Sequence, residues 1–169
     1  MIMEYKSRKN IRLKEYDYSQ NGAYFVTVCT KDRKHILSTI HVGGGALDAP
    51  IVELSQIGKS VENNIIKMNG LYENIKVSDY VIMPNHIHLM LIVNENGRSG
   101  APAPTPANAR VPRYVSTLKR FVNKECKFDI WQRSYYDHII RNEADYLEKS
   151  DYIINNPAKW AEDEYFTEG

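Results

Sequence analysis

The sequence predicts an α+β fold in which an antiparallel sheet carries its helices on one face, in the ferredoxin-like manner. Three observations predict it: runs of β-branched and aromatic residues, amphipathic segments of helical period, and short connections between them. The segments follow one another as strand, helix, strand, strand, helix and helix. Because short connections join strands that run in opposite directions, this order favours an antiparallel sheet.

Three segments have the composition of strands. Residues 24–30 follow an Asn-Gly turn and are β-branched or aromatic, so they predict the first strand. Residues 76–83 and 87–93 predict two more. Pro84-Asn85 stands between these two and indicates a bend or bulge, because proline cannot donate a backbone hydrogen bond to a sheet.

Three segments have the pattern of helices. Ser55 is a typical helix N-cap, and Gly70 is a typical stop. Between them an apolar stripe recurs at helical spacing, made of Ile57, Val61, Ile65 and Met68. Residues 115–126 and 143–156 predict the second and third helices.

Length and composition favour one globular domain over residues 1–169, since 43% of the chain is hydrophobic. Segments near 43–50 and 97–109 are rich in glycine or proline and are expected to be surface loops. The two cysteines form no disulfide framework, and no long apolar run predicts a leader or a membrane span. We therefore expect a reduced, cytoplasmic protein.

Charge is unevenly distributed, although the formal net charge is only +1. Residues 110–141 hold eight basic and three acidic side chains, a local excess that suits a polyanion such as nucleic acid. A solvated helix face would have the same composition. The candidate DNA contacts are Arg12, Lys119, Arg120, Lys124, Arg133 and His138.

Two histidines stand at i and i+2 within residues 83–93, a run that has the pattern of a strand. Side chains alternate along a strand, so His86 and His88 point to one face, and the apolar residues between and after them point to the other. A histidine pair on one face can bind one divalent metal ion. A surface or structural pair would have the same spacing.

The last predicted helix places one tyrosine among charges. At 3.6 residues per turn its core face is expected to hold Tyr146, Leu147, Ser150, Ile153 and Ile154. Tyr152 and Asn156 fall on the opposite face, four residues apart, so that the phenol and the amide could address one site. Pro157 ends the helix after that amide.

These motifs resemble a known family. His86-Ile87-His88 is similar to the His-hydrophobic-His motif of the HUH single-tyrosine transposases. The segment 151–157 (Asp-Tyr-Ile-Ile-Asn-Asn-Pro) resembles the tyrosine helix of their REP-associated branch. Residues 22–27, 81–86 and 130–142 resemble further core blocks in the same order, and together the blocks cover most of residues 21–160.

The resemblance implies an HUH endonuclease fold and cleavage of single-stranded or hairpin DNA. Tyr152 would be the nucleophile and would form a 5′-phosphotyrosine, as in a DNA transposase. Mg²⁺ or Mn²⁺ would be bound by His86 and His88, with Asn156 in the place of the third ligand, which is commonly Gln in the relatives. Related insertion-sequence enzymes dimerise, so a homodimer is possible, whereas no membrane partner is implied.

Two other functions compete with this one. A protein that binds hairpin DNA without cutting it, acting as a regulator, would retain the same scaffold without using Tyr152. A nucleotide hydrolase of the HIT type would need a third alternating histidine where Met90 stands. Tyr135 and Tyr136 are competing candidates for the nucleophile, in an aromatic cluster that could pack in the core or stack on bases.

Overall fold

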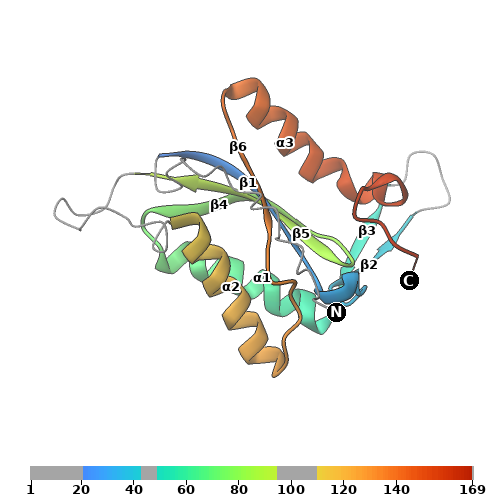
Figure 1. Ribbon diagram of the computed structural model, residues 1–169. Helices are drawn as coiled ribbons and strands as arrows, with labels where there is room; N and C mark the ends of the chain where they lie inside the picture. Colours follow the sequence, from blue (N-terminus) through green and yellow to red (C-terminus); the bar gives the residue numbers. More distant parts are fainter. Residues whose placement is uncertain (1–20, 43–48, 95–109, 169) are drawn as a thin grey trace, which may run out of the picture.

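The protein folds around a four-stranded antiparallel sheet with helices on both faces (Figure 1). The computed structural model describes residues 21–42, 49–94 and 110–168. The strands and helices are β1 (Gly22–Cys29), β2 (Ser38–His41), β3 (Ile51–Leu54), α1 (Gln56–Leu71), β4 (Ile75–Ile82), β5 (His86–Val93), α2 (Arg110–Cys126), β6 (Tyr136–Ile139) and α3 (Glu143–Asn155). Two short 3₁₀ helices are η1 (Lys31–Arg33) and η2 (Asn156–Glu162).

The sheet has the strand order β4-β5-β1-β6, and β1, β5 and β4 are the three strands that the sequence predicts. With β6 the main elements run β1, α1, β4, β5, α2, β6, which is the β-α-β-β-α-β order of ferredoxin-like folds. This confirms the predicted α+β class and the antiparallel sheet. Strand β6 was missed because its four residues include Asp137 and His138 and lack an apolar alternation.

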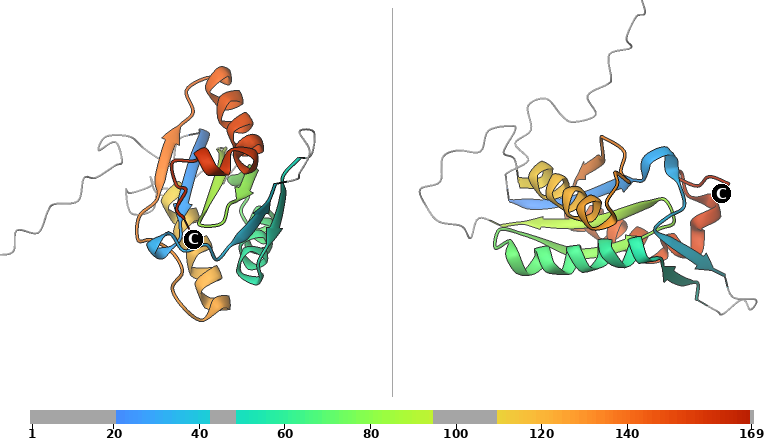
Figure 2. Two further views of the ribbon diagram at one scale, coloured as in Figure 1. Left: turned by 90° about the vertical axis from the view of Figure 1, so that its right-hand side faces the viewer. Right: turned by 90° about the horizontal axis from the view of Figure 1, so that it is seen from below.

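Strands β2 and β3 form a separate two-stranded hairpin that extends from the main sheet as an arm (Figure 2). The sequence did not predict this pair, because each strand has only four residues. The loops expected near 43–50 and 97–109 fall almost wholly outside the described residues.

The helices are divided between the two faces of the sheet (Figure 1). Helices α1 and α2 pack against each other and cover one face, as expected. Helix α3 lies on the opposite face, where Tyr152 contacts the ring of His88. The expectation that all helices share one face is therefore wrong for α3, because the polar face of the sheet is also buried and needs a cover.

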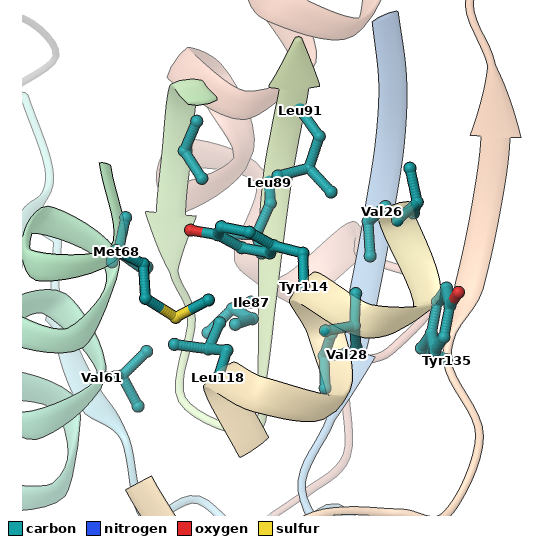
Figure 3. Packing of buried hydrophobic residues seen from close by; sticks show 14 of the residues in the cluster. Val26, Val28, Val61, Met68, Ile87, Leu89, Leu91, Tyr114, Leu118 and Tyr135 are labelled. Carbon is teal, nitrogen blue, oxygen red and sulfur yellow. The ribbon is translucent and has the colours of Figure 1, made fainter. Parts of the chain in front are cut away.

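The core lies between the sheet and the pair α1 and α2 (Figure 3). Val26 and Val28 of β1 and Ile87, Leu89 and Leu91 of β5 are fully buried and point to this side. They pack against side chains of the two helices, including Val61, Met68, Tyr114 and Leu118. The alternation read from the sequence of β5 is confirmed, and it sends His86 and His88 to the other face.

Helix α1 begins as the sequence predicts. Ser55 is the N-cap, and its hydroxyl oxygen accepts a hydrogen bond from the backbone N–H of Gly58 at 3.0 Å. The absence of a side chain at Gly58 lets the helix approach the backbone of Leu37. A Cβ atom at position 58 would lie 2.1 Å from the carbonyl oxygen of Leu37. The arm that carries β2 is thereby joined closely to α1.

We predict that Gly58→Ala lowers the free energy of unfolding by about 1–3 kcal/mol, because the added methyl group meets the backbone of Leu37. Gly70→Ala is the matched control within α1, since nothing lies within 4 Å of the corresponding Cβ position. It should be neutral or stabilising by up to about 1 kcal/mol. Urea unfolding followed by circular dichroism measures both. Equal stabilities for the two variants would contradict the close packing of Gly58 against Leu37.

Candidate metal and tyrosine site

His86 and His88 lie side by side on β5, on the face covered by α3. Both are buried, with 0% and 1% of their surface exposed. Their Nε2 atoms are 3.0 Å apart. The rings of Tyr165 and Trp160 lie against the His86 ring, with centroids 4.8 and 5.9 Å away. Two imidazole nitrogens are therefore held together beneath an aromatic cover.

The outer nitrogen of each histidine ring is fixed by a hydrogen bond. His88 Nδ1 is 2.8 Å from the hydroxyl of Thr27, its cross-strand partner on β1. His86 Nδ1 is 2.8 Å from Asn85 Oδ1. The amide nitrogen of Asn85 donates to the carbonyl oxygen of Tyr165, which assigns Oδ1 as the atom that faces His86. His86 Nδ1 is then the protonated nitrogen, and Nε2 keeps its lone pair.

Burial keeps both histidines neutral. It lowers the pKa of His86 from 6.5 to about 4; Asp163 opposes the shift and Arg33 adds to it. Burial, and then the neighbouring His86, lower the pKa of His88 well below its ordinary value. A neutral imidazole is the form that binds metal ions. The ring orientation, the tautomer of His86 and the charge of the pair all suit metal binding.

Asp163, the third member of this group, was not predicted from the sequence. Its carboxylate is buried, with Oδ2 3.9 Å from His86 Nε2. Asp163 follows η2 within an acidic stretch near the end of the chain, where one carboxylate stands out from its neighbours by no motif or spacing. Only the return of the chain across the sheet brings it to the histidines.

His86, His88 and Asp163 form a group that could hold a metal ion, with one donor atom from each within 4.8 Å of the others. Donor atoms that share an ion at about 2.1 Å lie about 3.0 to 4.2 Å apart, depending on the angle between them. The separation of the two Nε2 atoms, 3.0 Å, and that of His86 Nε2 from Asp163 Oδ2, 3.9 Å, lie within that range. Nitrogen and carboxylate donors suit several divalent ions, and the geometry does not choose among them.

Tyr152 reaches this group from α3. Its ring packs edge-on against His88 and Phe25, with centroids 5.2 and 5.9 Å apart. Its hydroxyl donates to Asp163 Oδ2 at 3.1 Å. Burial, and then the charge of Asp163, raise the pKa of Tyr152 above its ordinary value. Both effects favour the protonated phenol.

A cleft of about 570 Å³ opens beside Tyr152. The tyrosine itself is 37% exposed. It is lined by Phe25, Glu148, Lys149, Asp151, Tyr152, Asn155, Asn156, Lys159, Glu162, Asp163 and Glu164. The tyrosine is thus accessible from one side while its hydroxyl faces the buried carboxylate. A chain or strand lying in this cleft would reach Tyr152 without displacing the core.

The predicted core face of α3 is only partly correct. Ile153 is buried, but Leu147 and Ile154 are 54% and 67% exposed. Polar contacts help to decide which side of α3 faces the sheet: the hydroxyl of Tyr146 donates to Asp79 on β4 at 3.1 Å. Helical periodicity shows which residues share a face, but here the side that meets the sheet is partly polar, so hydrophobicity pointed to the wrong side.

Asn156, the predicted third ligand, is buried directly after α3. Its Nδ2 donates to Asp163 Oδ2 at 2.6 Å. The structure therefore brings His86, His88, Tyr152 and Asn156 together around Asp163. Their roles remain predictions.

The predicted DNA contacts are scattered. Lys119, Arg120 and Lys124 lie on α2, on the other face of the sheet from the histidines. The ammonium of Lys119 donates to three backbone carbonyls, those of residues 132, 133 and 134. Its position holds that segment in place.

The remaining three predicted contacts differ from one another. The side chain of Arg133 is exposed. His138 on β6 bonds to the carboxylate of Asp145 at 2.9 Å. Arg12 lies outside the described residues. None of the five that the structure describes is placed against the histidine pair, and a role in binding DNA remains a prediction for all six.

The chain was compared with known proteins. No protein-family model matches it. An uncharacterised protein of Haemophilus influenzae is 29% identical over 95% of this chain and 94% of its own length. A REP-associated tyrosine transposase of Escherichia coli K12 is 24% identical over 84% of this chain and 70% of its own length.

A solved structure of a REP-associated tyrosine transposase bound to a REP hairpin superposes with a TM-score of 0.61. It is 22% identical, and the match covers 88% of this chain and 73% of that one. This chain resembles the REP-associated tyrosine transposases. The resemblance read from the sequence motifs is thereby confirmed, and the solved relative shows that the fold is shared.

The resemblance to REP-associated tyrosine transposases extends across the described elements, since both matches cover more than four-fifths of this chain. Among the helices of the described residues, none combines the length and apolar character that crossing a bilayer requires.

We predict that Asn85→Leu lowers the free energy of unfolding by about 2–4 kcal/mol, because His86 Nδ1 and the carbonyl of Tyr165 both lose buried hydrogen bonds. Asn155→Ala is the control. Asn155 is exposed and bonds within its own helix, so its loss should change stability by less than about 0.5 kcal/mol. Denaturant unfolding of both variants measures the difference. A small effect at Asn85 would show that this link is dispensable.

Proposed function

We propose that the protein is a metal-dependent DNA endonuclease and strand transferase that forms a 5′-phosphotyrosine through Tyr152. One observation carries the proposal: the Tyr152 hydroxyl and the histidine pair lie against the same carboxylate, that of Asp163. The Tyr152 hydroxyl oxygen is 3.1 Å from Asp163 Oδ2, and His86 Nε2 is 3.9 Å from it. A nucleophile therefore lies next to a group suited to a cation, and Tyr152 and Asp163 both line an open cleft. This is the arrangement that tyrosine nuclease chemistry needs.

The proposed substrate is single-stranded DNA that contains a hairpin. Support comes from the solved relative, which is bound to a REP hairpin, and from the transposase relative in Escherichia coli. The cleft beside Tyr152 is open to solvent along the side of α3, so an extended strand can lie against it. The exposed basic residues Arg120, Lys124 and Arg133 are proposed to contact DNA phosphates away from this cleft.

In the proposed reaction the phenolic oxygen of Tyr152 gives up its proton and bonds to the scissile phosphorus. The bond from phosphorus to the 3′ oxygen breaks, and that oxygen takes a proton and leaves as a 3′-hydroxyl. Joining is the reverse, with a 3′-hydroxyl attacking and the tyrosine leaving, so the phosphodiester energy is kept in the covalent intermediate.

Several residues of the chain hold the reacting groups of this step in position. Phe25 and His88 pack against the Tyr152 ring and fix the direction of its hydroxyl. Thr27 and Asn85 hold the two histidines by their outer nitrogens. Bound Mg²⁺ or Mn²⁺ would supply positive charge to the phosphate oxygens and favour the phenolate over the phenol. That contribution matters because burial and Asp163 otherwise keep the phenol protonated.

We predict that Tyr152→Phe abolishes a covalent protein–DNA adduct while leaving hairpin binding within about threefold, since only the hydroxyl is removed. The assay mixes protein, Mn²⁺ and labelled single-stranded hairpins from the flanks of the gene, and resolves the products on a denaturing gel. Binding is measured separately by fluorescence anisotropy.

Tyr136→Phe is the matched control for this test. Tyr136 is also exposed, lies on the same face of the sheet, and was a competing candidate for the nucleophile. It should form the adduct as the wild type does. An adduct that persists in Tyr152→Phe would identify another nucleophile. A wild type that binds hairpins without any adduct would favour the non-cleaving regulator.

We also predict that the adduct requires a metal ion and the histidine pair. EDTA should abolish it, and added Mn²⁺ or Mg²⁺ should restore it. His86→Gln or His88→Gln should slow its formation by about 10³-fold, the size of a lost metal contribution of several kcal/mol. His41→Gln, an exposed histidine bonded to Glu53 on the β2–β3 arm, should have no effect. Full activity in EDTA would refute a role for metal.

A further inference from the structure

We infer that the carboxylate of Asp163 is the third metal ligand and that Asn156 is a positioning residue that holds this carboxylate. The inference rests on the proposed metal site and names a ligand that the sequence motifs did not. It reverses the expectation that the amide of Asn156 itself binds the ion.

The backbone and side chain of Asp163 are fixed. Its N–H donates to the carbonyl of Trp160 at 3.1 Å, and its Oδ1 accepts from the N–H of Tyr165 at 2.6 Å. The second of these is a local turn of the kind that aspartate favours. One carboxylate oxygen is thus used to fix the turn, while Oδ2 is directed at the histidines. Both oxygens are therefore placed before any ligand arrives.

The charge of Asp163 has no cationic partner in the part of the chain that the structure describes. Its one ion-pair contact there is with His86 at 3.9 Å, and the Nε2 atom that faces Asp163 carries a lone pair, because Nδ1 donates to Asn85. The donors to Oδ2 are the phenol of Tyr152 and the amide of Asn156, and both are uncharged. A buried carboxylate is costly unless a cation or a metal ion compensates it. A divalent ion between Oδ2 and the two Nε2 atoms would provide that compensation.

The amide of Asn156 is oriented by the same carboxylate. Its Nδ2 lies 2.6 Å from Asp163 Oδ2, and the reverse orientation would set an amide oxygen against a carboxylate oxygen. Its Oδ1 is buried, with no hydrogen-bond partner among the described residues. The donor end of Asn156 is therefore used to direct Asp163, which is the usual role of a side chain behind a metal ligand.

Two neutral nitrogens and one carboxylate also suit the proposed ions better than an amide would. Mg²⁺ and Mn²⁺ prefer hard oxygen donors, and a carboxylate adds a negative charge that an amide lacks. Two imidazoles alone would favour softer ions such as Cu²⁺ or Zn²⁺. Asp163 would thus determine which ions the site accepts.

The test is a calorimetric titration of the protein with Mn²⁺ in the absence of DNA. Asp163→Asn keeps the shape of the side chain and removes its charge, and should weaken binding by at least about 100-fold. Asn156→Leu should weaken it by about 10-fold, at the lower end of the range for residues behind a ligand. Asp163→Glu keeps the carboxylate and should bind more tightly than Asp163→Asn.

The double variant Asp163→Asn/Asn156→Leu separates the two roles. If Asn156 acts only through Asp163, the second substitution should cause no further loss of affinity. A further loss of about 10-fold or more in the double variant would mean that Asn156 contacts the ion directly and would overturn the inference. Thermal unfolding without metal verifies that each variant is folded.

Glu164→Gln is the matched control, because Glu164 is the adjacent acid and lines the same cleft. Unchanged Mn²⁺ affinity in this variant would show that the loss in Asp163→Asn depends on the position of that carboxylate, and not on the general negative charge of the cleft. Wild-type affinity in Asp163→Asn would overturn the inference and leave the proposed function standing, provided that His88→Gln still loses Mn²⁺. A wild type that binds no Mn²⁺ would overturn both.

Discussion

The rest of the structure depends on the alternation of side chains along β5, which is buried on both faces. One set of side chains, Ile87, Leu89 and Leu91, joins the core under α1 and α2. The other set, His86 and His88, is held beneath α3 and the segment after it. A slip of one residue in register would send the histidines into the apolar core. The same apolar packing that stabilises the fold therefore fixes the direction of both imidazoles, so the site has little freedom to adjust.

Burial of the polar face has a cost that hydrogen bonds must offset. Each buried imidazole has two nitrogens, and the outer ones are satisfied by Thr27 and Asn85. Asn85 also bonds to the backbone of Tyr165, so one amide connects the histidine strand to the segment that follows η2. This connection positions Asp163, two residues before Tyr165. The site is thus a buried polar network whose members depend on one another.

The sequence predicted what is local and missed what depends on tertiary contacts. The histidine pair and the helix of Tyr152 follow from side-chain period within single elements, and the resemblance to transposases identified them as related. Asp163 could not be found in this way, because nothing in its neighbourhood distinguishes it from Glu162 and Glu164. The exposure of Leu147 and Ile154 was also out of reach, since polar contacts of α3 with β4 decided which side of the helix meets the sheet. Hydrophobic period is informative only where apolar burial decides the packing.

The charges around Tyr152 explain why a cation is central to the proposed chemistry. The cleft is lined by five acidic side chains and two lysines, whereas the basic residues Arg120 and Lys124 of α2 lie on the other face of the sheet. Phosphate groups entering this cleft meet a negative field, and field strength rises as water is excluded. Contacts on distant basic surfaces can retain DNA on the protein, but screening at physiological salt limits their reach to about 8 Å. The positive charge that neutralises these phosphates must therefore be a cation within the site itself. His86, His88 and Asp163 surround the position for it beside the tyrosine hydroxyl.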